Sequence, residues 1–237
     1  MVKDRIVAIS GAAGGLGPTV AKAFADAGAR LAVAERDPSK AQTLLDGLGI
    51  PAARGLVTGA DLTDPAQAAR WRDEIVGKLG GVDVVVHLVG GYRGGTTIEE
   101  TLPEDWDFLN RLLVLTTLSV ARAFAGPLRA RGWGRFLAVT STKAQAPTAK
   151  SALYSMGKAA SDALVLALAD ELRGTGATAN LVVVDSIDTP QTRDPSVKKP
   201  YGKTAPAEEI AAAMLFLCSE EAATINGARL PLTGRGA

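Results

Sequence analysis

The chain has 237 residues, and 47% of them are hydrophobic, which is enough to bury a sizeable core. The 26 basic and 25 acidic residues leave a formal net charge of +1 without any charged run, so neither nucleic acid nor an anionic membrane is predicted as a partner. Cys218, the single cysteine, excludes an intramolecular disulfide and fits a reducing compartment. We expect its thiol to be a buried apolar group rather than a nucleophile.

Targeting signals are weak in this sequence. Residues 3–5 are Lys-Asp-Arg, followed by only a short apolar run, so the N-terminus lacks the pattern of a signal peptide. No apolar stretch is predicted to be long and charge-free enough to span a bilayer. We therefore expect a cytoplasmic protein.

Short β-branched runs alternate with helical patterns from the N-terminus onward. Residues 5–10 are typical of a strand, and residues 16–27 place Val20 and Phe24 on one helical face before Gly28 ends the helix. A second strand is expected at 31–34. Further elements are expected as a helix from Pro38, strands at 56–57, 82–89, 134–141, 179–184 and 228–232, and helices at 66–79, 103–131, 151–173 and 206–219.

The run at 82–89 is almost continuously apolar, as in a parallel strand that is buried on both faces. Alternation of strands and helices predicts one parallel sheet with helices on both sides, within a single domain over residues 1–237. Residues 185–205 contain three prolines and form the only long irregular stretch, which we interpret as a loop on the substrate side.

A glycine-rich turn joins the first strand to the first helix. It contains Gly11, Gly15 and Gly17, followed by an acidic residue, Glu35, after the second strand. Glycine allows a tight turn and a close approach of backbone to a pyrophosphate, which the helix N-terminus would attract. The context favours a dinucleotide site in a Rossmann-type, doubly wound sheet of about seven strands over a plain strand-to-helix turn.

Glu35 and Arg36 bear on the choice of dinucleotide. A carboxylate at the end of the second strand accepts hydrogen bonds from ribose hydroxyls and repels a 2′-phosphate, which favours NAD(H). The guanidinium of Arg36 could pair with that phosphate, so NADP(H) stays open. The alternative interpretation of both residues is an ordinary solvated strand end.

Tyr154 and Lys158 lie four residues apart on one face of the helix expected at 151–173. A nearby ammonium ion lowers the pKa of a tyrosine, which would bring Tyr154 toward working pH as a general acid or base. Ser141 ends the fifth expected strand, where its hydroxyl could hold a substrate carbonyl oxygen.

Together, these motifs resemble the short-chain dehydrogenase/reductase family over essentially the whole chain. Residues 10–17 resemble its TGxxxGxG motif, residues 154–158 match its YxxxK motif, and Ser141 has the spacing of its catalytic serine. The resemblance implies hydride transfer between a carbonyl and an alcohol, catalysed by Ser141, Tyr154 and Lys158. It also implies cofactor contacts by Gly11, Gly15, Leu16, Gly17, Glu35, Arg36, Asp61, Leu62, Gly90, Tyr154, Lys158, Ile187 and Thr189.

Three positions depart from the family pattern. After the fourth strand, where the family usually has Asn-Asn-Ala-Gly, this chain has His-Leu-Val-Gly at residues 87–90. We interpret His87 as a hydrogen-bonded residue at the strand end rather than as a proton-transfer group. Leu113 occupies the place of the catalytic asparagine, and Asn110 lies one turn earlier on roughly the same face. Residues 184–185 are Val-Asp instead of Pro-Gly. The departures motivate one alternative from another class, a nucleotide-binding regulatory or scaffold protein, although all three catalytic residues are retained.

The resemblance also implies a homotetramer or homodimer that acts on a small carbonyl or alcohol. The apolar helices at 112–125 and 152–168 could form the interface through Leu112, Leu115, Leu118 and Leu164, or could only cover the sheet. The sequence does not identify the substrate. A lyase or dehalogenase that has given up nicotinamide is disfavoured, because the glycine turn is kept.

Overall fold

The computed structural model describes residues 2–190, 193 and 202–234. Its main sheet has seven strands in the order β3-β2-β1-β4-β5-β6-β9, and every pair of neighbours is parallel. The predicted fold class is therefore confirmed. The strands are β1 (Ile6–Ser10), β2 (Arg30–Glu35), β3 (Gly55–Gly59), β4 (Val84–His87), β5 (Gly134–Ser141), β6 (Ala177–Val184) and β9 (Arg229–Pro231).

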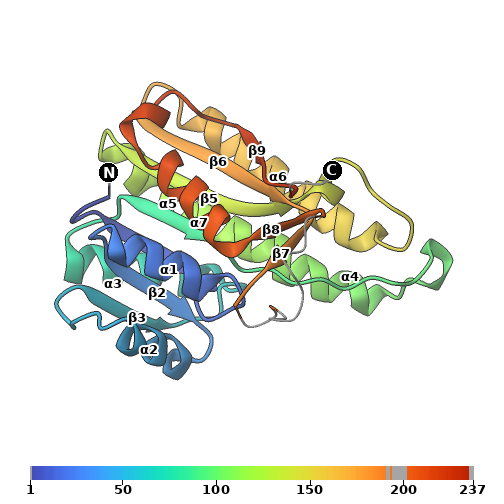
Figure 1. The fold of residues 1–237 in the computed structure, drawn as a ribbon, viewed down its shortest axis with the longest axis horizontal. Helices are drawn as coiled ribbons and strands as arrows, with labels where there is room; N and C mark the ends of the chain where they lie inside the picture. The colour runs from blue at the N-terminus through green and yellow to red at the C-terminus, as the bar shows by residue number, and fades with distance from the viewer. Residues whose placement is uncertain (1, 191–192, 194–201, 235–237) are drawn as a thin grey trace.

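Helices follow the strands in the predicted alternation (Figure 1). Proline occupies an early position in α1, α2 and α3, where a missing N–H costs nothing, and Asp37 and Asp64 cap the second and third helices. The helices are α1 (Gly17–Asp26), α2 (Pro38–Gly47), α3 (Pro65–Leu79), α4 (Pro103–Leu109), α5 (Thr116–Ala130), α6 (Ala152–Glu171) and α7 (Ala207–Leu217), with short turns η1 (Ile98–Glu100), η3 (Thr142–Ala144) and η4 (Glu220–Ala222).

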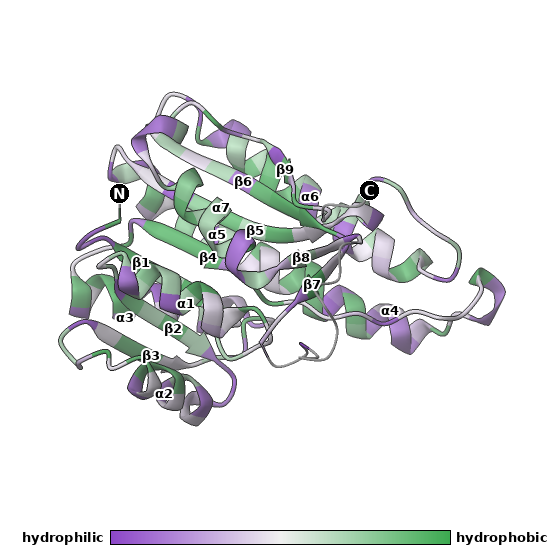
Figure 2. Cartoon of the chain, viewed as in Figure 1, coloured by the Kyte–Doolittle hydropathy of each residue, from purple (hydrophilic) through white to green (hydrophobic). Residues whose placement is uncertain are grey.

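Two apolar clusters bury the two faces of the sheet. Residues from α3, α5 and α6 form the first cluster, and residues from α1, α2 and α7 form the second. Along β1, Ile6 and Ala8 belong to the first cluster while Val7 and Ile9 belong to the second, as the twofold side-chain alternation of a strand requires. Accordingly, β4 is mostly hydrophobic in Figure 2. The sheet is thus buried on both sides.

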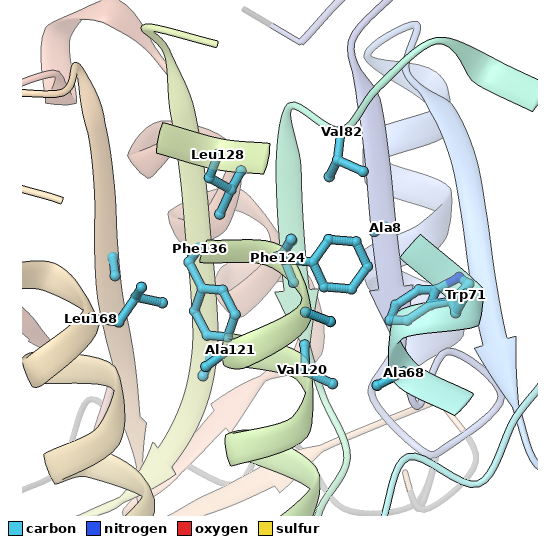
Figure 3. Close-up of a cluster of buried hydrophobic side chains, with 14 of the residues drawn as sticks. Ala8, Ala68, Trp71, Val82, Val120, Ala121, Phe124, Leu128, Phe136 and Leu168 are labelled. Atoms are coloured by element: carbon cyan, nitrogen blue, oxygen red, sulfur yellow. The ribbon is translucent and has the colours of Figure 1, made fainter. Parts of the chain in front are cut away.

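Aromatic side chains fill the first cluster (Figure 3). The rings of Trp71 on α3 and Phe124 on α5 meet edge to face, with their centroids 5.0 Å apart. Both side chains are fully buried, so their contact fixes α3 beside α5 under β1 and β4.

The helix predicted at 103–131 forms, but with an unpredicted irregularity. A π-helical segment, η2 (Asn110–Leu115), separates α4 from α5. By length and composition, Pro103–Ala130 is apolar enough to cross a membrane, so the prediction that no stretch reaches this threshold was wrong. Half of its most apolar window is buried inside the protein, and α5 packs against α3 and α6. The apolar character of α5 therefore serves the core.

The stretch 185–205 is less irregular than predicted. Two short strands, β7 (Ser186–Asp188) and β8 (Thr204–Pro206), pair in parallel at its two ends. In Figure 1 they lie at the carboxyl end of the sheet. Pro195 and Pro200 lie outside the described residues. The backbone pairing of β7 positions the residues that follow it over the glycine turn.

Candidate active site

A cleft opens at the carboxyl ends of β1 and β4, where the strand order reverses direction, which is where doubly wound sheets bind ligands. One part has a volume of about 340 Å³ and is lined by the glycine turn, Tyr154, Lys158, Ile187 and Thr189. The adjoining part, of about 260 Å³, is lined by Glu35, Arg36, Asp61 and Leu62. Gly11, Gly14 and Gly90 line both parts. The structure therefore brings nearly all the predicted site residues together around one cleft.

The glycine turn has no room for side chains at two positions. Gly11 has a φ of +74°, and a Cβ atom there would lie 2.9 Å from the backbone nitrogen of Val89. A Cβ atom on Gly17 would clash with the carbonyl of Ala12. At Gly15 a Cβ atom would fit, 3.6 Å from Cγ2 of Thr189, but it would extend into the cleft. These glycines leave the floor of the cleft to bare backbone.

Glu35 is tied to this turn. Its Oε1 atom accepts a hydrogen bond of 2.8 Å from the backbone N–H of Ala13, while Arg36 is exposed. Asp61 is held by Thr63, whose backbone N–H and hydroxyl donate to it at 2.9 and 2.8 Å. These bonds to Thr63 lower the pKa of Asp61. Two carboxylates thus face the part of the cleft away from Tyr154.

Tyr154, Lys158 and Ser141 form a cluster at the other end of the cleft. Ser141 lies next to the Tyr154 phenol and acts to lower its pKa. The Ser141 hydroxyl accepts from the backbone N–H of Lys143 at 3.2 Å. Lys158 is buried, and its Nζ atom donates to the carbonyl oxygen of Val139 at 3.0 Å. Ser141 contacts the cluster through Tyr154 and does not itself line the cleft.

The expected direction of the Tyr154 pKa shift was wrong. Burial of the phenol raises its pKa, and the neighbouring Ser141 side chain offsets this only in part. Tyr92 and the charge of Asp185 raise the pKa of Tyr154 further, while burial lowers the pKa of Lys158 to about 8. The structure therefore keeps Tyr154 as a protonated phenol near neutral pH.

His87 ends β4 beneath this cluster, buried and hydrogen-bonded on both ring nitrogens. Nδ1 lies 2.8 Å from the hydroxyl oxygen of Ser10, and Nε2 lies 3.1 Å from that of Thr117. The Thr117 hydroxyl donates its only proton to the carbonyl of Leu113 at 2.6 Å, so it must accept from Nε2–H. Ser10 then donates to Nδ1. His87 is a neutral link between the glycine turn and α5, in line with the favoured interpretation.

Cys218 follows the predicted pattern as well. It is buried in the second apolar cluster, and burial raises the pKa of its thiol to about 12. Such a thiol does not ionise near neutral pH and is therefore not a nucleophile.

Two residues near the cleft escaped the sequence reasoning. Tyr92 lies in the glycine-rich segment after β4, and its ring meets that of Tyr154 edge to face at 5.0 Å. Asp185 accepts hydrogen bonds from the Thr142 hydroxyl at 2.8 Å and from Lys143 Nζ at 3.4 Å. An isolated tyrosine between glycines gives no periodic signal, although its place after a central strand could have indicated a site residue.

The comparison with protein families matches residues 11–234 to a family model described as enoyl-(acyl carrier protein) reductase. The chain belongs to the short-chain dehydrogenase/reductase family. This family member is 28% identical over 241 residues to an acetoacetyl-CoA reductase of Allochromatium vinosum, with 97% of each chain covered. It is 30% identical over 244 residues to a 2,5-dichloro-2,5-cyclohexadiene-1,4-diol dehydrogenase of Sphingobium indicum, covering 97% of this chain and 95% of that one.

A solved structure extends this similarity. The 3-ketoacyl-(acyl-carrier-protein) reductase of Brucella melitensis, complexed with NADH, superimposes with a TM-score of 0.88 at 26% identity and full coverage of both chains. The short-chain dehydrogenase/reductase described here is a nicotinamide-dependent oxidoreductase that interconverts a carbonyl and an alcohol. The relatives give no support to the alternative of a regulatory or scaffold protein.

The departure at Leu113 has a clear structural form. Leu113 lies in the π-helical segment, and its side chain packs against Gly157 on α6. The packing is close, because a Cβ atom added at Gly157 would lie 3.0 Å from Cδ1 of Leu113. Asn110 is half-buried and does not line the cleft. The side chain at position 113 therefore offers Lys158 no polar partner.

The hydrogen-bond pattern of His87 predicts its titration. Burial, followed by the Lys158 charge, lowers its pKa to about 3, so ¹⁵N NMR of the imidazole should show the neutral Nε2–H form throughout pH 5 to 8. Between about pH 6.5 and pH 3 the folded protein then binds fewer protons than the unfolded chain. The free energy of unfolding should therefore fall as the pH is lowered through this range, by up to about 1.4 kcal/mol per pH unit. His87→Asn should lose this part of the slope. A wild-type midpoint near 6.5 would contradict the assignment.

Proposed function

We propose that this reductase or dehydrogenase acts as one domain, with Tyr154 as its general acid or base, Lys158 as the cationic group at the cofactor ribose, and Ser141 as the group that orients the substrate oxygen. One observation carries the proposal: Tyr154 and Lys158 line the same cleft as the glycine turn, and Ser141 lies next to the phenol. Proton transfer and dinucleotide binding thereby share one site.

The described residues fit a dinucleotide. Bare backbone at Gly11 and Gly15, at the N-terminus of α1, suits a pyrophosphate. Leu62 and Gly90 line the cleft toward the adenosine side, and Ile187 and Thr189 line it toward Tyr154. When bound, the nicotinamide supplies or accepts the hydride.

The protein itself supplies the proton for the substrate oxygen and holds that oxygen in position. In the reducing direction, the protonated phenol of Tyr154 donates to the substrate oxygen, and the Ser141 hydroxyl holds that oxygen in place. Lys158 contributes a buried positive charge, which stabilises the phenolate left by this step. In the oxidising direction the phenolate removes the alcohol proton.

Tyr154→Phe tests this assignment. It removes the proton donor while keeping the ring, so kcat for a small ketone should fall by about 10²- to 10⁴-fold with the Kd for NADH within about twofold. Tyr92→Phe is the matched control, because it removes the same hydroxyl from the ring in contact with Tyr154. Its kcat should stay within about threefold of wild type. Equal losses in both variants would refute the role of Tyr154.

The preference for NAD(H) over NADP(H) is part of the proposal. The Glu35 carboxylate faces the adenosine side of the cleft, with one oxygen bonded to Ala13 and the other free to accept from ribose hydroxyls. A 2′-phosphate would meet this negative charge. Arg36 is exposed and is the one basic side chain lining that part of the cleft among the described residues.

Glu35→Gln separates charge from hydrogen bonding, since the amide oxygen can still accept from Ala13. We expect NADPH to bind about tenfold more tightly to this variant than to wild type, with NADH binding weakened by less than about fivefold. Fluorescence titration of both cofactors measures the ratio. Wild-type protein that already prefers NADPH would show that Arg36 outweighs Glu35.

A homo-oligomer also belongs to the proposal, and the cytoplasm stays our prediction for its location. Phe108 on α4 and Leu118 on α5 are 42% and 44% exposed, and Leu112, Leu115 and Leu164 are partly exposed nearby. Covering this apolar surface would stabilise a dimer or tetramer.

Light scattering at micromolar concentration should give two or four times the chain mass of 24.4 kDa. Leu118→Glu should shift the protein toward monomer, because a carboxylate would be buried in the interface. Thr43→Glu, at an exposed position of α2 on the other face of the sheet, is the control. A monomeric wild type would contradict the oligomer.

A further inference from the structure

A small polar cavity lies beneath the Lys158 side chain. Its volume is about 10 Å³, and its walls include His87, Leu113, Thr140, Lys158 and Asp162. A cavity of this size has room for about one water molecule, provided that polar atoms face it. Lys158 lines both this cavity and the cofactor cleft, as do Val89, Val139 and Thr140, so the two spaces adjoin.

Two buried polar atoms in the walls of this cavity have no hydrogen-bond partner among the described residues: Oγ1 of Thr140 and Oδ1 of Asp162. Thr140 is 2% exposed and Asp162 is 1% exposed. An unpaired carboxylate oxygen at such depth costs several kcal/mol in general, and buried polar atoms are nearly always paired. One water that donates to Asp162 and bonds to Thr140 would satisfy both atoms.

Asp162 is also the counter-charge nearest to Lys158 along α6, one helical turn further on. Its other oxygen, Oδ2, accepts from Nε of Arg229 on β9 at 3.1 Å, so the carboxylate is fixed in place. Burial lowers the pKa of Lys158, and the charge of Asp162 works against that fall. The carboxylate therefore favours the ammonium form.

The other groups that face Lys158 cannot take this role. His87 at the end of β4 is neutral, and Tyr154 on the same helix is a protonated phenol. Leu113, from the π-helical segment, presents only methyl groups. Arg229 is positive and reaches the cluster through Asp162.

We propose that Asp162 is the positioning residue for the catalytic lysine: with a water shared with Thr140, its carboxylate holds Lys158 as an ammonium ion directed at the cofactor cleft. Of the three N–H groups of Lys158, Val139 accepts one, the water accepts the second, and the third is left for the cleft. The catalytic value of this arrangement rests on the function proposed for Lys158, but its electrostatics do not.

The direct test follows the Lys158 charge without any substrate. In protein labelled with [ε-¹³C]lysine, NMR titration gives the pKa of each lysine, and the Lys158 signal is the one missing from Lys158→Arg. We expect Asp162→Asn to lower the Lys158 pKa from about 8 by about one unit or more. Asp26→Asn is the matched control, because it removes an exposed carboxylate four residues after Lys22 and should move that lysine little.

Thr140→Val keeps every charge but removes one partner of the water, and its hydroxyl makes no bond whose loss would unfold the protein. It should lower the Lys158 pKa by less than Asp162→Asn does, and it carries the test if that variant does not fold. Unchanged Lys158 titration in both variants would overturn the proposal.

Turnover gives a second readout. If Lys158 must be an ammonium ion, the alkaline limb of the kcat/KM profile should move to lower pH in Asp162→Asn by the same amount as the NMR pKa. A purely structural role would lower kcat/KM at every pH without moving the limb. If no substrate is turned over by wild type, the proposed function fails while the NMR result still decides the role of Asp162.

Discussion

The close approach of backbone to backbone at Gly11 is the constraint on which the cleft depends. With a positive φ and its Cα facing Leu88 and Val89, Gly11 lets β1 turn directly against the chain that leaves β4. Ser10, the residue before it, is bonded to His87 at the end of β4. The strand ends are thereby locked together, and the bare backbone of the turn becomes the floor of a binding site. A side chain at position 11 would force these two segments apart.

A second consequence of this packing is a buried positive charge. Lys158 is buried between β5 and the π-helical segment, where a lysine tends to lose its proton. The neighbouring histidine is neutral, the tyrosine keeps its proton, and Leu113 offers no polar group. The polar support for the lysine must come from the carbonyl of Val139 and, on our proposal, from Asp162 and a shared water. The polar environment of Lys158 thus comes from β5, α6 and β9.

Much of this architecture could be predicted from the sequence, because it depends on local patterns. Alternating strand and helix signals predicted the parallel sheet, and the predicted site residues in the glycine turn, Tyr154 and Lys158 all line one part of the cleft. The pairing of β7 with β8 could not be predicted, since three-residue strands carry no periodicity. The π-helical segment, the rise in the pKa of Tyr154 and the isolated oxygen of Asp162 all depend on burial by distant segments. Sequence spacing does not encode such contacts.

Binding of the dinucleotide at the glycine turn is the central claim, and titration with NADH tests it most directly. Fluorescence titration of wild type should give saturable binding, which Gly15→Trp should abolish, because its side chain would fill the cleft beside Thr189. Gly77→Trp makes the same substitution on α3. A Cβ atom added at Gly77 would meet no atom of another segment within 4 Å, so this variant should bind NADH like wild type. Saturable binding by Gly15→Trp, or none by wild type with either NADH or NADPH, would contradict the account.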